Sequence, residues 1–121
     1  MKQFVFVLLI IVATAALGAN SNMNGTWNVK DNIAGKESES VCMLTQKAMD
    51  FSGTCKGDDG NVDITGKVDG NRVSWQLKSD YNGQTLTVVY TGTMDSDSTI
   101  TGKIDVQPIG ASGDFTAKKA K

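Results

Sequence analysis

Histidine is absent from the 121-residue sequence, which has one proline and two cysteines. The missing histidine removes the commonest general base and the commonest metal-binding side chain of proteins. The 12 basic and 13 acidic residues form no dominant basic patch, which makes nucleic acid a poor candidate partner. The acidic stretch from Gly57 to Asp63 lacks the ligand spacing and the closing glutamate of an EF-hand loop. We therefore expect no metal, no cofactor and no nucleic-acid partner.

Residues 1–18 have the form of a secretory signal peptide. Lys2 gives a short basic start, an almost purely apolar run follows from Phe4 to Leu17, and residues 16–18 form a small-x-small cleavage pattern. The apolar run is shorter than the ~20 residues that a membrane-spanning helix needs. We therefore expect a secreted or periplasmic protein that has no membrane span after cleavage and folds residues 19–121 into one domain.

The remaining sequence alternates apolar and polar residues with a period of two, as from Val73 to Leu77. This period is typical of half-buried β-strands. Pairs such as Asn82-Gly83 between the alternating runs supply the positive φ angles of tight hairpin turns. The pattern predicts an all-β fold, an eight-stranded antiparallel up-and-down β-barrel. The strands are expected near residues 25–33, 37–46, 51–56, 61–68, 72–80, 84–94, 99–106 and 111–119.

A repeated Ser-Gly or Thr-Gly pair places five glycines on the apolar face of the expected strands. A strand interior disfavours glycine unless the chain must bend or leave room. Small barrels require both, because their strands coil sharply and their interior is narrow. The repeat therefore favours a closed barrel, whose eight strands enclose an interior that side chains just fill or that holds one small ligand. These glycines are Gly53, Gly66, Gly92, Gly102 and Gly113.

The two cysteines are expected on adjacent strands. If the hairpin between them centres between Ala48 and Met49, Cys42 lies directly opposite Cys55. Opposed Cα atoms in an antiparallel pair lie ~4.5–5.5 Å apart, within the range of a disulfide. Export would place the chain in an oxidising compartment, where closing this loop contributes about 3 kcal/mol in the chain-entropy model. We expect a Cys42–Cys55 disulfide rather than two buried thiols.

The Gly-Thr-Trp sequence from Gly25 to Trp27, followed by a one-domain β-meander, resembles the calycin barrels, which include lipocalins, fatty-acid-binding proteins and avidins. In those families the Gly-x-Trp motif places an indole across the closed end of the barrel, under a basic residue from the last strand. The resemblance implies that Trp27 closes the barrel, that Gly25 allows the tight entry of the chain, and that Lys119 covers the indole, with Lys118 as the next candidate. A cation over an indole contributes roughly 0.5–2 kcal/mol.

The sequence is also similar to a secreted bacterial domain type of uncharacterised function. That type carries Gly-Thr-Trp, Leu-Thr-Gln, Ser/Thr-Gly-Thr, Gly-Lys-Val-Asp-Gly-Asn, Tyr-Thr-Gly-Thr and a final Gly-x-Phe-Thr-Ala. The matching segments span nearly the whole chain after the leader. They lie at residues 25–27, 44–46, 52–54, 66–71, 90–93 and 113–117.

The residues expected to point inward are apolar, and no carboxylate is expected among them. A catalytic cavity would need polar groups there, so we expect a protein that is not an enzyme. A packed core is the favoured interpretation of these residues. The functional alternative is a pocket that holds a small apolar ligand, which makes the protein a binding protein. The candidate lining residues are Trp75, Tyr90, Leu77, Val88 and Met94.

A second functional hypothesis is a protein–protein interaction module, such as an inhibitor of a secreted hydrolase. Small secreted inhibitors are among the proteins that the calycin resemblance includes. Such a module would act through a free N-terminal tail at residues 19–24, or through loops at residues 79–84 and 95–98 that are expected at one mouth of the barrel.

Overall fold

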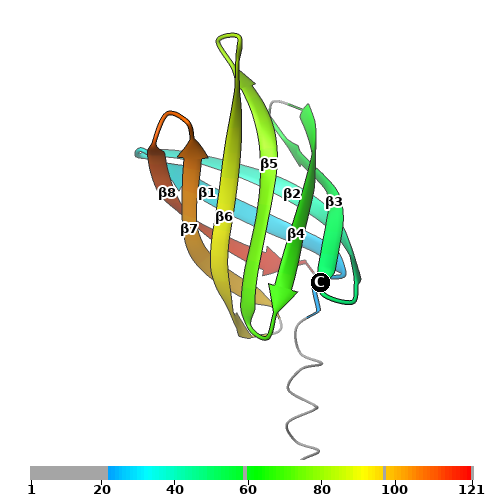
Figure 1. Cartoon of the computed structure of the whole chain (residues 1–121). Coiled ribbons are helices and arrows are strands. Elements are labelled where there is room, and N and C mark those ends of the chain that lie inside the picture. Colours follow the sequence, from blue (N-terminus) through cyan, green and yellow to red (C-terminus); the bar gives the residue numbers. More distant parts are fainter. Residues whose placement is uncertain (1–21, 59, 97, 121) are drawn as a thin grey trace, which may run out of the picture.

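The computed structural model describes residues 22–58, 60–96 and 98–120 as a closed antiparallel barrel with strands in sequence order (Figure 1). The expected fold class is confirmed. The expected leader at residues 1–18 lies outside the described residues. The strands are β1 (Gly25–Ile33), β2 (Lys36–Lys47), β3 (Asp50–Gly57), β4 (Gly60–Asp69), β5 (Arg72–Tyr81), β6 (Gln84–Ser96), β7 (Thr99–Gln107) and β8 (Ala111–Lys119).

Pairing between the first and last strands closes the sheet. Trp27 lies opposite Cys42 on β2 and opposite Lys119 on β8. Along β1, alternate side chains from Trp27 to Asp31 are buried, while those between them are exposed. This alternation follows from the pleat of a strand and puts one residue set inside the barrel. The sequence period thus predicts which β1 side chains point inward.

Tight turns connect the strands at both ends of the barrel. Asn82 and Gly83 have φ angles of 51° and 80°, as the Asn-Gly pair predicts for a two-residue hairpin turn. Strands β5 and β6 extend up to this turn, so the loop expected at residues 79–84 is mostly strand. The prediction that residues 79–84 and 95–98 share one mouth is wrong, because successive turns of an up-and-down barrel lie at opposite ends.

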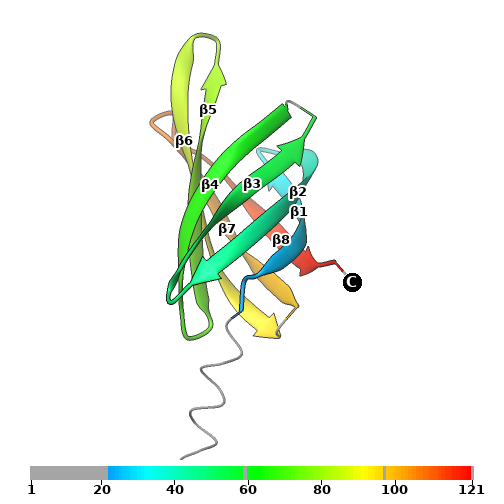
Figure 2. The ribbon, with the colours of Figure 1, turned by 90° about the vertical axis from the view of Figure 1, so that its right-hand side faces the viewer.

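The two ends of the barrel differ, and we name them by what lies there. The plugged end carries residues 22–24 and the β2–β3, β4–β5 and β6–β7 connections. The hairpin end carries the β1–β2, β3–β4, β5–β6 and β7–β8 connections. At this end the β5–β6 hairpin extends beyond the neighbouring strands, as both views show (Figures 1 and 2).

Glycines create room for aromatic side chains inside the barrel. A Cβ atom on Gly66 would lie only 2.5 Å from Cζ of Phe51 and 2.7 Å from Cβ of Trp75. A Cβ atom on Gly92 would lie 2.9 Å from Cζ of Phe115, and Gly92 pairs with Gly102 on β7. The inward glycines predicted from the repeat therefore have a packing role.

A disulfide joins Cys42 on β2 to Cys55 on β3, as predicted from the register. The two residues lie directly opposite each other, and both are buried in the core. Disulfides persist in oxidising environments, so this bond fits a non-cytoplasmic location.

Candidate ligand-binding site

The plugged end is closed by the N-terminal segment and a tryptophan. Met23 and Trp27 are each 1% exposed. The Trp27 indole N–H donates to the Met23 carbonyl at 3.0 Å, and the Met23 amide donates to Oε1 of Gln46 at 2.6 Å. The expectation of a free tail is therefore wrong for residues 22–24, because Met23 is buried and bonded to the barrel. Residues 19–21 lie outside the described part of the chain.

Lys119 covers the closing indole from the last strand. Its Nζ lies 5.3 Å from the Trp27 ring centroid and donates to the Asn22 carbonyl at 3.2 Å. Gly25 begins β1 with a φ of 120°, a conformation that L side chains rarely adopt. Gly25, Trp27 and Lys119 therefore lie together at the plugged end.

An aromatic cluster fills the middle of the barrel. The Trp75 and Tyr90 rings stack with centroids 4.8 Å apart and planes 15° apart. Phe115 packs edge-on against both, with centroids 5.0 Å from Trp75 and 5.2 Å from Tyr90. Phe51 adds a further edge contact to Trp75 at 6.3 Å. Such pairs contribute about 0.5–1.5 kcal/mol each beyond their buried area, so the cluster is a rigid centre of the core.

A buried carboxyl group lies against this cluster. Asp31 is 9% exposed, and its Oδ2 accepts a hydrogen bond from the Tyr90 hydroxyl at 2.6 Å. Its Oδ1 is buried and has no hydrogen-bond partner among the described residues. The expectation of an interior without a carboxylate is therefore wrong. The alternation that places Trp27 and Val29 inside continues to Asp31, so the register could have identified this residue.

Burial controls the titration of the Asp31–Tyr90 pair. Desolvation raises the pKa of Asp31, and the hydrogen bond from Tyr90 lowers it by less. Desolvation also raises the pKa of Tyr90, with further contributions from the Asp31 charge and the shared hydrogen bond. Tyr90 therefore stays protonated and acts as the donor, whereas Asp31 is held closer to its neutral form than an exposed aspartate.

The interior near the plugged end contains a void of only about 10 Å³. A cavity of that size holds about one water molecule. Of the five predicted lining residues, only Trp75 borders it. Tyr90 stacks on Trp75, and Leu77 pairs with Val88 towards the hairpin end. Met94 pairs with Ile100 towards the plugged end, so the structure does not gather all five around one space.

The hairpin end presents partly exposed apolar side chains. Ile33, Leu77 and Ala111 pack against the core but keep part of their surface in solvent. Tyr81 is 61% exposed at the tip of β5 and shares the inward alternation of Trp75 and Leu77. Ile109, in the β7–β8 turn, is also exposed. Apolar groups therefore reach solvent at this end, whereas Met23 and Trp27 seal the other.

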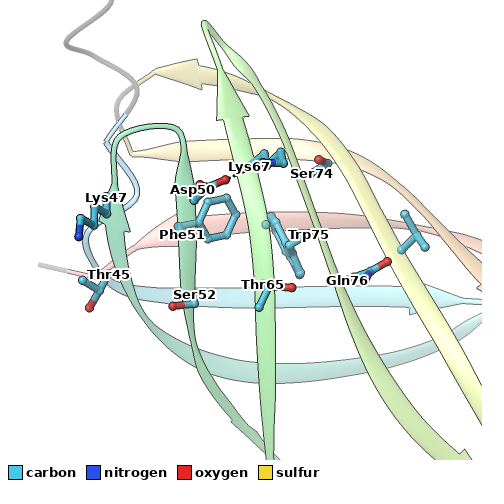
Figure 3. A pocket seen from close by; sticks show the side chains of 12 residues that line it. Thr45, Lys47, Asp50, Phe51, Ser52, Thr65, Lys67, Ser74, Trp75 and Gln76 are labelled. Atoms are coloured by element: carbon cyan, nitrogen blue, oxygen red, sulfur yellow. Dashed lines mark hydrogen bonds and ion pairs between the residues drawn. The ribbon is translucent and has the colours of Figure 1, made fainter.

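An open groove of about 670 Å³ lies on the outer wall of the barrel. Figure 3 shows two rows of side chains that cross strands β2 to β5 in register. The outer wall of a closed, twisted sheet is concave along the barrel axis, which accounts for the hollow. The first row is Thr45, Ser52, Thr65 and Gln76, and the second is Lys47, Asp50, Lys67 and Ser74. The lining also includes Phe51, Gly66 and Trp75 between the rows and Val89 on β6, so the predicted site residue Trp75 borders this groove as well.

The groove combines an apolar floor, to which Phe51, Trp75 and Val89 contribute, with the two polar rows, and it carries one ion pair. Nζ of Lys67 lies 2.7 Å from Oδ1 of Asp50, and both side chains are exposed to solvent. An exposed pair of this kind contributes about 0–1 kcal/mol. Over the described residues, no group of three or more histidine, cysteine, aspartate or glutamate side chains is arranged to hold a metal ion. Likewise, the described part of the chain contains no helix long and apolar enough to cross a membrane.

Comparisons with known proteins identify the fold. No protein-family model and no curated protein matches the sequence. A redesigned β-barrel of known structure is similar with a TM-score of 0.70 and 15% identity, covering 86% of this chain and 96% of that chain. A second redesigned β-barrel, solved bound to DFHBI, has a TM-score of 0.67 and 18% identity, covering 84% and 99%. A de novo designed fluorescence-activating β-barrel has a TM-score of 0.62 and 16% identity, covering 85% and 98%.

Proposed function

We propose that this chain is a secreted or periplasmic, non-enzymatic binding protein that takes a small, mainly apolar ligand at the hairpin end of the barrel. The observation that carries the proposal is the difference between the two ends. Met23 and Trp27 seal one end, whereas Ile33, Leu77 and Ala111 expose apolar surface at the other. Small-molecule sites are lined mainly by apolar side chains with a few polar groups, a composition that this end shares.

The volume of the interior restricts where the ligand can lie. Because the enclosed void near the plugged end is about 10 Å³, the described barrel has no room there for an organic molecule. The ligand would instead occupy the hairpin end, above the layer formed by Asp31 and Tyr90. Tyr81, on the projecting hairpin, would contact it from the side.

The fold comparison supports a binding role. A redesigned barrel with the same strand arrangement was solved bound to DFHBI, so a barrel of this size is compatible with a small ligand. Export is supported by the signal-peptide pattern of residues 1–18 and by the Cys42–Cys55 disulfide. The lack of histidine and the single buried carboxyl–phenol pair among the described residues favour binding over catalysis.

Tryptophan fluorescence with a matched pair of variants tests the proposed site. The disulfide-bonded chain is titrated with a panel of small ring compounds, with emission from Trp75 and Trp27 as the readout. Leu77→Lys should weaken the response at least tenfold, because it places a charge among the apolar groups of the hairpin end. Val41→Lys, on an exposed outward position of β2, should leave it unchanged. Silence of the wild-type chain across the panel would reject the proposal.

A second candidate function is the docking of a secreted protein partner, such as a hydrolase, in the outer groove. The groove volume of about 670 Å³ and its two rows of exposed polar side chains around an apolar floor favour this candidate. It ranks second because a shallow hollow on a twisted sheet is a general feature of barrels. Co-purification of a single secreted hydrolase that is lost with Thr65→Arg and kept with Leu77→Lys would support it. Equal recovery with both variants would exclude the groove.

A further inference from the structure

The Asp31 carboxyl group is a buried acid with an unused acceptor. Tyr90 satisfies Oδ2, but Oδ1 has no partner among the described residues. None of the described lysines or arginines forms an ion pair with it. A buried polar atom without a partner is costly, and an unpaired buried charge costs more. A bound group that donates a hydrogen bond to Oδ1 would remove this cost.

Asp31 lies close enough to the hairpin end for a ligand to reach it. The next inward residue along β1 is Ile33, which is only partly buried at the rim. On β2 the residue directly opposite Asp31 is Ser38, which is exposed and shares the inward alternation of Cys42. On β8 the residue directly opposite Asp31 is Phe115, so the carboxyl group lies at the hairpin-end edge of the aromatic cluster, one inward residue below Ile33.

We propose that Asp31, held by Tyr90, is the polar anchor of the hairpin-end site, and that the ligand is a small apolar amine whose ammonium group binds Oδ1. This inference rests on the proposed function and adds the chemical class of the ligand. A cation is the natural complement of an unpaired buried carboxylate, because a charge-assisted hydrogen bond offsets the desolvation of both groups.

The same geometry disfavours ligands with an acidic headgroup. A carboxylate placed near Asp31 would bring two like charges into a poorly solvated space, and one of them would have to bind a proton. Fatty acids and other apolar acids should therefore bind more weakly than amines of the same size. Asp31 thus distinguishes ligands by the charge of their headgroup. The apolar side chains of Ile33 and Leu77 at the rim contact the ring system of the ligand.

A matched ligand series tests the anchor by isothermal titration calorimetry of the disulfide-bonded chain. The probes are naphthylethylamine, naphthylethanol and naphthylacetate, which share one ring system and differ in the headgroup. The amine should bind about tenfold tighter than the alcohol, and the acid should bind weakest. Asp31→Asn should remove the preference for the amine and keep the binding of the alcohol. Asp105→Asn, the same change at an exposed carboxylate on β7, should leave the preference intact.

The possible outcomes separate this inference from the proposed function. Equal binding of all three probes would overturn the anchor and keep a hairpin-end site. A preference for the amine that survives Asp31→Asn would also overturn the anchor, because the cation would then bind elsewhere. No binding of any probe would overturn both.

A second measurement keeps the inference testable if Asp31→Asn does not fold. The carbon-13 shift of the Asp31 carboxyl carbon can be followed in the wild-type chain as naphthylethylamine is added. Ammonium binding at Oδ1 predicts a shift change that saturates with the calorimetric binding curve. An unchanged Asp31 signal during binding would contradict the anchor.

Discussion

The Tyr90 hydroxyl on β6 donates a 2.6 Å hydrogen bond to Oδ2 of Asp31 on β1, joining residues 59 positions apart across the interior of the barrel. The two strands are separated by β7 and β8 in the closed sheet, so the bond crosses the interior. The bond also fixes the hydroxyl group of Tyr90, whose ring stacks on Trp75. The bond therefore connects the aromatic core to the hairpin end, where we place the ligand.

Removing the Tyr90 hydroxyl should destabilise the fold. Tyr90→Phe keeps the ring stack but leaves both oxygens of the buried Asp31 carboxyl without a protein donor. We expect the free energy of unfolding to fall by about 1–3 kcal/mol, measured by denaturant titration. Tyr81→Phe, at an exposed tyrosine, serves as the control and should change it by less than about 0.5 kcal/mol. Equal effects of the two variants would contradict a structural role for the bond.

The buried Asp31 should make stability depend on pH. Its pKa is raised in the folded chain, so the folded state binds more protons than the unfolded state between the usual aspartate pKa of about 3.9 and the raised value. The contribution of Asp31 to stability is therefore full below this window and is lost as pH rises through it.

Denaturation of the wild-type chain and Asp31→Asn at a series of pH values measures this dependence. The wild-type free energy of unfolding, relative to that of the variant, should decrease with rising pH across the window. A constant difference from roughly pH 3 to 8 would show that the pKa of Asp31 is not raised by burial.

The plug formed by Met23 should contribute to stability although it precedes the first strand. Met23→Ala removes a side chain that is 1% exposed, whereas Met49→Ala removes one that is 52% exposed in the β2–β3 turn. We expect a loss of about 2–5 kcal/mol for Met23→Ala, because a cavity forms beside Trp27. Met49→Ala should cost less than about 0.5 kcal/mol. Thermal or denaturant unfolding of both variants measures the two losses of stability. A negligible loss for Met23→Ala would mean that the N-terminal segment does not close the barrel.

Adding one methyl group at an inward glycine should also destabilise the fold. Gly66→Ala places a Cβ atom against the Ser74 carbonyl oxygen and 2.5 Å from Cζ of Phe51, so the β5 backbone and the aromatic cluster must shift, at a cost of about 1–3 kcal/mol. Gly57→Ala is the matched control, because its Cβ would meet its nearest neighbours at an ordinary 3.6 Å. Near-ultraviolet circular dichroism should report a changed aromatic environment for Gly66→Ala alone. An unaltered spectrum and stability for that variant would disprove the packing role of the glycine.

The sequence predicts much of the fold because the strand period, the turn residues and the cysteine register are local signals. Alternation places Trp27 and Trp75 inside, and the hairpin centre between Ala48 and Met49 pairs Cys42 with Cys55. The same alternation includes Asp31, but an aspartate near a turn is easily taken for an exposed residue at the end of a strand. The alternation alone marks Asp31 as inward, and the contact with Tyr90 shows what holds it there.

Other features of the site depend on three-dimensional packing that no local pattern encodes. Met23 lies in a polar segment outside the strand period, and it is buried only because the chain folds over Trp27. The small interior void depends on how side chains of distant strands fit together. The outer groove depends on the curvature of the closed sheet, so residues such as Thr65 have no sequence signal for it.

Mapping a bound probe by nuclear magnetic resonance tests the central claim most directly. The isotope-labelled, disulfide-bonded chain is titrated with naphthylethylamine, and the amide shifts are followed residue by residue. Binding at the hairpin end predicts the largest changes at Asp31, Ile33, Leu77 and Tyr81, with little change at Trp27 or at Thr65 in the outer groove. Changes centred on Thr65, or no saturable change anywhere, would contradict the account.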